Sequence, residues 1–511
     1  MQVLAFILYF VLILAVGLFF FFRSKSAGEK EYFLGGRAMG PWVTAMSAQA
    51  SDMSGWLLMG FPGSIFAFGM GKVWIGIGLA LGTAANWILV AKRLRRFSRA
   101  SGDAITMPQY LTNRFASKSP VLKIICAVIF LISFTVYVSS AFVAGKSVMI
   151  AVIPWFADKE TLAMAIFALL ILLYTFLGGY KAVCWTDFFQ GIMMLIALLA
   201  VPIVMATGNF DNSFTSSFAD GVATFESNPF TADWRDIVTG LSWGLGYFGM
   251  PHIIVRFMAI KKPSQVKKAS IVAIAWVIIT LGSAIVMAIL GRTYLFNDGT
   301  SLAQILLPNG NQQNIFLVLT QQIFPPIIAG FLLAAIVAAA MSTADSQLLV
   351  ASSSFTSDLY KPLIRKEKAS EKELLWVGRI VVFIVSVVAF FIASSNIPWA
   401  KSIMAMVENA WGLFGAAFGP VILLSLFWSR FNYAGACAGI VTGAVVDIAW
   451  LLCFTSTILE KPILVATGIY EILPGFIAGL IAAIIVTLCT KAPSVEVKEI
   501  FASATDKSID D

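Results

Sequence analysis

Two stretches of the chain combine polar and helix-breaking residues inside long apolar segments. The first, residues 47–56, contains Asp52, and the second, residues 242–252, contains three glycines and Pro251. Both compositions predict interrupted helices, because glycine and proline destabilise a helix interior. An interruption within a membrane frees peptide carbonyls and amides that lipid cannot satisfy, so we expect the two breaks to surround a bound ligand.

The groups freed at such breaks favour particular ligands. Carbonyl oxygens suit a hard cation such as Na⁺, and the amide end of a half-helix suits a carboxylate. Asp52 adds a formal charge, which costs roughly 2.5–3.5 kcal/mol in mid-membrane. We interpret it as a cation-coupling residue; the alternative is a structural ion pair with a neighbouring arginine such as Arg37.

A third polar patch, residues 339–346, lies inside another apolar run. It offers the adjacent hydroxyls of Ser342 and Thr343 and the carboxylate of Asp345, which are hard oxygen ligands. Hydroxyls in membrane helices often bond only to their own helix or bridge to a neighbour, so the patch predicts a cation site mainly in company with Asp52.

Two further ionisable residues have competing interpretations. Asp187 predicts a polar path on the cytoplasmic side, or else a carboxylate that is solvated or paired with Lys181. His252, the single histidine, either stabilises the second break by hydrogen bonding or carries a proton; we favour the structural role.

The composition indicates a polytopic membrane protein. Of 511 residues, 59% are hydrophobic and 12% charged, against roughly 45–50% and about 25% in soluble domains. The net charge of +8 comes from short basic clusters between apolar runs, not from one nucleic-acid-binding face. At about 20 apolar residues per span, we expect an all-α protein with about thirteen transmembrane helices, near residues 3–22, 38–62, 70–91, 120–149, 160–177, 183–205, 236–259, 269–290, 314–350, 377–394, 398–428, 432–455 and 466–490.

The basic clusters predict the orientation of the chain. They fall on every second connection, at residues 23–37, 92–99, 114–123, 256–268 and 361–379. Those connections are expected in the cytoplasm, with the N-terminus outside and the tail inside. The connections near 206–235 and 292–313 are expected to be external loops. The tail after Ala492 is expected to be flexible, because it lacks the apolar content of a core.

The chain resembles the sodium:solute symporters over most of its length. The matching runs are LGGR (34–37), ASDMSGWLLMG (50–60), WTD (185–187), WGLGYFG (243–249) with the following Pro251 and His252, MST (341–343) and FGAAFGP (414–420). The resemblance implies a cell-membrane symporter and not an enzyme. It also implies a LeuT-type core of two inverted five-helix repeats, with proline as the expected cargo and sodium as the co-transported ion.

The same resemblance implies a division of the single transport domain, residues 1–511. Its parts are an extra helix at 3–22, a first repeat at 38–205, a second repeat at 236–428, two extra helices at 432–490 and a tail at 491–511.

Three groups of site residues follow from matching this chain to the family position by position. The sodium site would comprise the carbonyls of Ala50, Met53 and Ala339 and the hydroxyls of Ser342 and Thr343, with Asp52 in coupling. The substrate pocket would comprise Ser54, Gly55, Trp56, Tyr137, Trp243, Tyr247 and Pro251. Gating or a second cation would involve Arg37, Asp187, Asp345 and Ser346.

The expected mechanism is alternating access, in which sodium binds first and completes the pocket for the solute. The alternatives are the same machine with a sugar, sialic acid or pantothenate as cargo, a proton-coupled transporter, and a sensor built on a transporter frame. No obligate protein partner and no nucleic acid are indicated.

Overall fold

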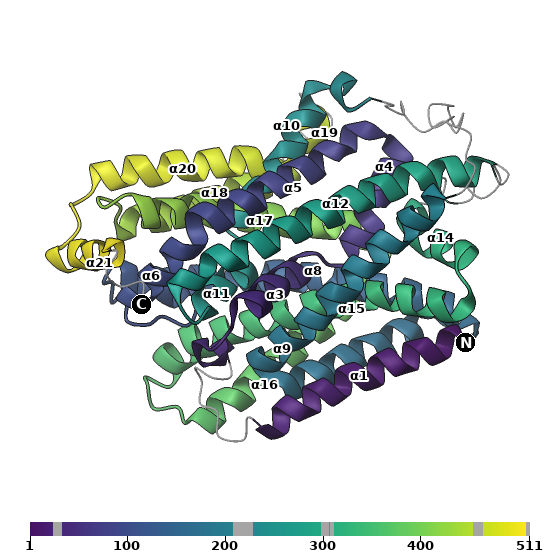
Figure 1. Ribbon diagram of the computed structural model, residues 1–511. Coiled ribbons are helices and arrows are strands. Elements are labelled where there is room, and N and C mark those ends of the chain that lie inside the picture. The colour runs from purple at the N-terminus through teal and green to yellow at the C-terminus, as the bar shows by residue number, and fades with distance from the viewer. Residues whose placement is uncertain (24–32, 208–227, 298–305, 307–310, 453–462, 507–511) are drawn as a thin grey trace.

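The computed structural model describes residues 1–23, 33–207, 228–297, 306, 311–452 and 463–506. Within these ranges the chain is helical and forms no β-strand; the helices run side by side as one bundle (Figure 1). The predicted external connections near 206–235 and 292–313 fall largely outside the described residues.

The first half of the bundle contains three long helices and several short ones. Its elements are α1 (Gln2–Arg23), η1 (Gly35–Arg37), α3 (Pro41–Asp52), η2 (Trp56–Gly60), α4 (Phe61–Phe68), η3 (Met70–Lys72), α5 (Val73–Ala85), η4 (Asn86–Ala91), α6 (Lys92–Ala100), α7 (Met107–Arg114), α8 (Val121–Val152), η5 (Pro154–Phe156) and α9 (Glu160–Ala206).

The second half follows after residue 228. Its elements are η7 (Pro229–Thr231), α10 (Trp234–Ser242), η8 (Trp243–Phe248), α11 (Pro251–Ala259), η9 (Pro263–Gln265), α12 (Val266–Asn297), η10 (Asn311–Asn314), α14 (Ile315–Ile323), α15 (Pro326–Ser353), η11 (Ser354–Ile364), α16 (Glu371–Ser394), η12 (Pro398–Lys401), α17 (Ile403–Phe427), α18 (Tyr433–Leu452), α19 (Ile463–Thr467), α20 (Ile472–Cys489) and α21 (Val495–Thr505).

Every predicted span has a helical counterpart. Ten helices of the described residues are long and apolar enough to cross a membrane. The other three predicted spans are interrupted: those near 38–62 and 236–259 are broken, and that near 160–177 ends at a kink in α9. The kink lies at Gly179, whose φ of 60° and ψ of 175° favour glycine.

One long predicted span consists of two helices. The stretch near 314–350 forms α14 and α15, separated at Phe324 and Pro325. Proline has no backbone N–H to donate, so it interrupts the hydrogen bonding of a helix interior. Its fixed φ nevertheless suits the first turn of a helix. Pro325 and Pro326 therefore end one helix and start another.

Helix α15 lies at the centre of the bundle and is buried over nearly all of its length. It packs against α1, α3, α8 and α9. Its middle, residues 334–344, is rich in alanine, and small side chains let helices approach closely in a membrane bundle. The hydroxyls and carboxylate of this helix are consequently held among its neighbours.

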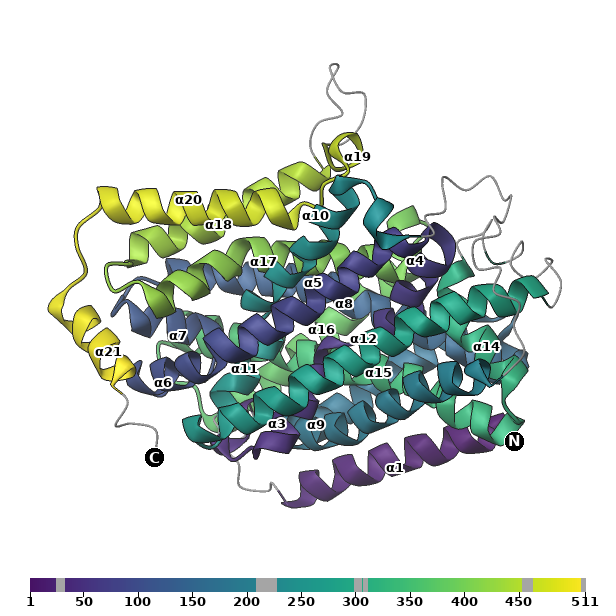
Figure 2. The same cartoon turned by 45° about the horizontal axis from the view of Figure 1, so that its top comes forward.

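The two ends of the bundle carry different elements. In Figures 1 and 2, α4, α14 and the N-terminus lie at one end, while α6 and α21 lie at the other. We refer to these as the N-terminal end and the α6 end.

The prediction of a flexible tail is wrong for residues 495–505, which form α21 against α6. The Phe501 and Phe97 rings meet edge to face with centroids 5.4 Å apart, and Arg114 Nη1 donates to the Val497 carbonyl over 3.4 Å. A segment with too few apolar residues to form its own core can still fold by packing against another helix, here α6.

Candidate functional site

The first predicted break occurs where α3 ends. Met53 has φ −82° and ψ 75°, outside the helical region, and the chain becomes helical again at Gly55. A Cβ at Gly55 would lie 2.8 Å from the Ala144 Cβ on α8, so a larger side chain would force the two segments apart. The interruption inside the predicted span near 38–62 is confirmed.

The second predicted break follows η8. The 3₁₀ turn over Trp243–Phe248 leads to Met250, whose φ of −76° and ψ of 109° are extended, and Pro251 then opens α11. Proline suits this position, because it needs no partner for a backbone N–H at the first helical turn. The second interruption is likewise confirmed.

Asp52 connects the two breaks. It is 1% exposed, and its Oδ2 accepts a hydrogen bond from the Tyr247 hydroxyl over 2.6 Å. The Tyr137 hydroxyl donates to the Asp52 carbonyl over 3.4 Å. Within the described residues, Oδ1 of Asp52 has no hydrogen-bond partner. The carboxylate thus holds the second broken helix and keeps one oxygen for a further ligand.

The alternative pairing of Asp52 with Arg37 is not observed. Arg37 Nη2 lies 3.0 Å from Asp103 and 2.7 Å from the Ala104 carbonyl. These contacts tie η1 to the loop after α6, at the α6 end of the bundle. Nearby, Met39 pairs with Ile260 in an isolated bridge, so several contacts close the chain together at this end.

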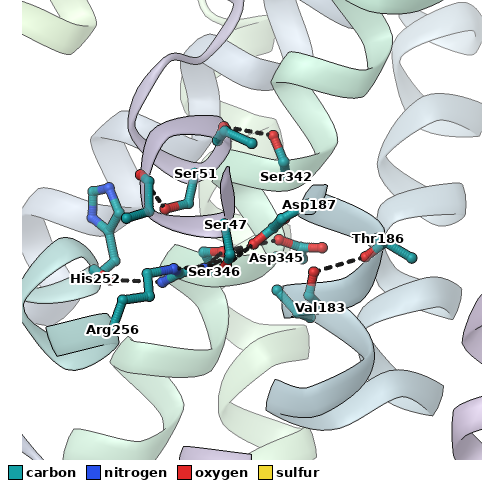
Figure 3. Close-up of polar contacts among 12 residues, drawn as sticks. Ser47, Ser51, Val183, Thr186, Asp187, His252, Arg256, Ser342, Asp345 and Ser346 are labelled. Atoms are coloured by element: carbon teal, nitrogen blue, oxygen red, sulfur yellow. Dashed lines mark hydrogen bonds and ion pairs between the residues drawn. The ribbon is translucent and has the colours of Figure 1, made fainter. Parts of the chain in front are cut away.

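In Figure 3, Ser342 on α15 points to the backbone at the end of α3. The Ser342 hydroxyl lies 2.8 Å from the Ala50 carbonyl and 3.1 Å from the Ala339 carbonyl. Thr343 Oγ1 is buried and lacks a hydrogen-bond partner in the described part of the chain. Met53, the fifth predicted ligand, is fully buried at the break itself.

This donor set suits a hard monovalent cation better than a transition metal. In the described ranges, no three His, Cys, Asp or Glu side chains group together to hold a metal ion. Neutral carbonyl and hydroxyl oxygens are hard ligands without fixed geometry. The arrangement can therefore exchange the Ser342 hydrogen bonds for a cation and hold α3 against α15 through it.

Aromatic rings surround the breaks. Trp56 and Trp243 have ring centroids 6.3 Å apart, and Tyr247 meets Trp411 edge to face at 5.0 Å. Trp411 Nε1 donates to the Trp243 carbonyl over 2.8 Å. The seven predicted pocket residues are all buried: Ser54, Gly55, Trp56, Tyr137, Trp243, Tyr247 and Pro251.

A cavity of about 1170 Å³ lies toward the N-terminal end of the bundle. It is lined by residues of α4, α8, η10, η12 and α17, and Trp243 is the one predicted pocket residue among its lining. Charged side chains at its wall include Lys72, Lys401 and Glu408. Trp243 therefore stands between this cavity and the buried groups around Asp52.

A second polar centre lies one turn along α3 and α15 and is organised by Arg256 (Figure 3). Its Nη2 lies 3.0 Å from Asp187 Oδ2 and donates to the Ser346 hydroxyl over 2.5 Å. Its Nε donates to the Ser47 hydroxyl over 3.0 Å, and the Ser47 hydroxyl donates to Asp187 Oδ2 over 2.6 Å. We call these four residues the Arg256 network.

The Arg256 network corrects two sequence-based interpretations. Arg256 was counted among the basic residues of a cytoplasmic connection, but its side chain is 1% exposed and ion-paired. For Asp187, the structural alternative was a solvated carboxylate or a pair with Lys181. The side chain is instead 0% exposed and is paired with Arg256. The available signal was that Arg256 lies one helical turn after His252 in an otherwise apolar helix.

Asp345 lies beside this network, next to its member Ser346. The Ser346 hydroxyl lies 3.3 Å from Asp345 Oδ1. Asp345 Oδ2 and Asp187 Oδ1 are buried without hydrogen-bond partners in the part of the chain that is described. One guanidinium thus faces two carboxyl groups here, which leaves room for one further positive charge or one proton.

These features define the class of the molecule. Two broken helices cross a bundle of apolar spans, and their unwound segments bring oxygen ligands and aromatic rings together at its centre, as in secondary transporters built on inverted repeats.

The comparisons agree with this class. The sodium:solute symporter family matches residues 32–443. The sodium/proline symporter of Escherichia coli (strain K12) is 42% identical over 479 residues, 93% of this chain and 90% of that protein. The osmoregulated proline transporter OpuE of Bacillus subtilis (strain 168) is 41% identical over 488 residues, 95% of this chain and 94% of that protein. The chain belongs to the sodium:solute symporter family.

Solved structures confirm the predicted LeuT-type fold. A Na⁺-coupled sialic acid symporter in a substrate-bound outward-open state has a TM-score of 0.76 at 21% identity, covering 96% of this chain and 98% of that one. MhsT in complex with L-phenylalanine has a TM-score of 0.53 at 15% identity, covering 87% and 97%. Family membership also places the chain among transporters and not enzymes. The residue boundaries of the repeats and the roles of the site residues stay predictions.

Proposed function

We propose that this protein is a sodium-coupled symporter that imports L-proline across the cell membrane by alternating access. The names of both relatives specify proline, and each relative is more than 40% identical to this chain over more than nine-tenths of this chain's length. The sequence identity to these relatives supports proline as the cargo. The contacts at the first break support sodium as the coupled ion.

One observation carries the sodium assignment. The Ser342 hydroxyl donates to the Ala50 carbonyl at the first break over 2.8 Å. The neighbouring Thr343 hydroxyl has no hydrogen-bond partner among the residues that the structure describes. A buried hydroxyl without a partner is costly. Sodium bound between the carbonyls of Ala50, Met53 and Ala339 and the two hydroxyls would satisfy all of these groups at once.

The coupling follows from the contacts of Asp52. Sodium fixes the end of α3 against α15, and Asp52 at that end holds Tyr247 of the second break over 2.6 Å. The cation consequently orders both sides of the proposed pocket, formed by Ser54, Gly55, Trp56, Tyr137, Trp243, Tyr247 and Pro251, before proline enters. Because both ligands stabilise the same state, each must raise the affinity for the other by the same factor.

The orientation proposed for the chain places the N-terminus outside and the C-terminal tail in the cytoplasm. The cavity of about 1170 Å³ then faces outward, and the contacts of Arg37 and of Met39 with Ile260 close the cytoplasmic side. We assign Arg37 and Asp187 to this inner gate. Asp345 and Ser346 are the proposed surroundings of a second cation.

The deciding experiment is uptake of radiolabelled proline into liposomes that contain only the purified protein. We expect accumulation with an inward Na⁺ gradient and none with an equal K⁺ gradient. Unlabelled proline should compete, whereas a sugar, sialic acid or pantothenate should not. Uptake driven by a pH gradient without sodium, and lost in His252→Gln, would instead indicate proton coupling.

A further inference from the structure

Three carboxyl groups gather where α17, α18 and α20 meet, away from the two polar centres described above. Glu408 lies on α17, Asp447 on α18, and Glu471 directly precedes α20. Glu471 and Asp447 are 0% and 1% exposed. The three carboxyl groups and the Tyr470 hydroxyl lie within electrostatic reach of one another.

Asp447 and Glu471 share one small space beside Gly412. A Cβ at Gly412 would lie 3.1 Å from Asp447 Oδ1 and 3.3 Å from Glu471 Oε1. Both oxygens of Glu471, and Oδ1 of Asp447, are buried without a hydrogen-bond partner among the described residues. Although Glu471 stands at the N-cap of α20, its side chain does not cap that helix.

The basic groups of this region that the structure describes do not neutralise the pair. Lys72, which acts on Glu408, is ion-paired with Asp236 over 2.8 Å. Arg235 is exposed and lies beside the backbone that precedes Tyr470. The Tyr470 hydroxyl donates to the Glu408 backbone carbonyl over 2.7 Å and not to a carboxylate.

Two adjacent carboxylates in an apolar interior cannot both remain ionised when, as among the described residues here, Asp447 Oδ1 and both oxygens of Glu471 have no hydrogen-bond donor. We propose that Asp447 and Glu471 form a buried proton-binding site, which exchanges its proton with water in the outer cavity by way of Glu408. Glu408 lines that cavity, so it supplies the route. The proton adds to a carboxylate oxygen on entry and returns to water on leaving, without any other reactant.

The site connects to the pocket proposed above for proline. Trp411, on α17 beside Gly412, donates to the Trp243 carbonyl over 2.8 Å, and the Trp243 and Tyr470 rings lie 5.1 Å apart. Loss of the proton puts charge between α17, α18 and α20 and separates them. The outer part of the bundle is therefore less stable at alkaline pH.

The test is the melting temperature of the purified protein in detergent between about pH 6 and about pH 9, which needs no transport and so is independent of the proposed function. We expect a fall of roughly 5 °C for the wild type, because ionisation of the pair destabilises the folded bundle. The double variant Asp447→Asn/Glu471→Gln mimics the protonated pair and should fold with a flat profile. The matched control Asp158→Asn, at an exposed carboxylate, should follow the wild type.

Other outcomes overturn the proposal. A double variant with the wild-type slope excludes the pair as the titrating group. Failure of the double variant and of both single amide variants to fold also overturns it, since amides resemble the protonated acids. A rise in melting temperature with Na⁺ at about pH 9, at constant ionic strength and absent in the double variant, would mean that a metal cation occupies the site.

Discussion

Two polar centres lie one helical turn apart along α3 and α15: the Asp52 centre, with Asp52 and Ser342, and the Arg256 network. They differ in whether a basic side chain of the protein bonds the carboxylate. At the Asp52 centre, Asp52 and Thr343 each keep a buried oxygen without a partner in the described chain. In the Arg256 network, Arg256 is bonded by Asp187, Ser47, Ser346 and the His252 carbonyl. Asp187 Oδ1 also has no hydrogen-bond partner in the described chain, but Asp187 Oδ2 is paired with a cationic side chain, whereas the Asp52 carboxylate bonds only the Tyr247 hydroxyl.

The difference supports the choice of the Asp52 centre as the site of the mobile ion. In the Arg256 network the protein supplies its own cation, because the Arg256 guanidinium pairs with Asp187. No basic side chain bonds to Asp52 or Ser342 in the described structure, so the proposed sodium ion would supply the positive charge there. We therefore expect the Asp52 centre to govern sodium binding and the Arg256 network to govern the stability of the bundle.

The largest effect is expected for Arg256→Gln. Removal of one partner of a buried ion pair leaves Asp187 uncompensated, which costs about 3–5 kcal/mol. Thermal unfolding in detergent should show a large fall in melting temperature. The double variant Arg256→Gln/Asp187→Asn should recover much of that loss, because it removes both charges. A double variant as unstable as the single one would show that the pair does not act as a unit.

Asp52→Asn should have the next largest effect, on sodium and not on stability. The substitution removes the negative charge that accepts the hydrogen bond from Tyr247. A hydrogen bond to a charged group contributes about 1.5–3 kcal/mol. At 1.4 kcal/mol per tenfold, the sodium concentration for half-maximal proline uptake should rise roughly 10- to 100-fold. Asp158→Asn, at an exposed site, is the control. An unchanged sodium dependence in Asp52→Asn would remove this residue from the coupling.

Much of this comparison was predictable from the sequence. Gly244, Gly246, Gly249 and Pro251 each lower the stability of a helix, so the second break could be predicted from the sequence, although a similar run in α17, with Pro420 inside it, stays helical. The spans were predictable too, because the number of apolar residues needed to cross the membrane is a local property of the sequence. The roles proposed for the site residues came from family resemblance, since spacing alone does not bring Ala50 to Ser342, 292 positions along the chain.

What the sequence could not show is which charges meet. Arg256 stands close to Lys261 and Lys262 in sequence and has the pattern of a cytoplasmic basic cluster. Its burial is decided by how α11 packs against α3, which is a tertiary property. The prediction of a flexible tail failed because the order of α21 also depends on tertiary packing, here against α6.

A pair of serines gives the smallest and most specific test of the comparison. Ser342 and Ser47 are both 0% exposed, and each bonds groups of its own centre. Ser342→Ala removes a proposed sodium ligand, so we expect about a tenfold rise in the sodium concentration for half-maximal uptake, which corresponds to about 1.4 kcal/mol. Ser47→Ala loses hydrogen bonds to Arg256 and Asp187 and should lower the melting temperature while sodium dependence stays near that of the wild type. Because the two substitutions are identical in size and burial, a shared effect on sodium would show that the two centres act as one site. Opposite assignments, with Ser47 controlling sodium and Ser342 only stability, would place the ion at the Arg256 network instead.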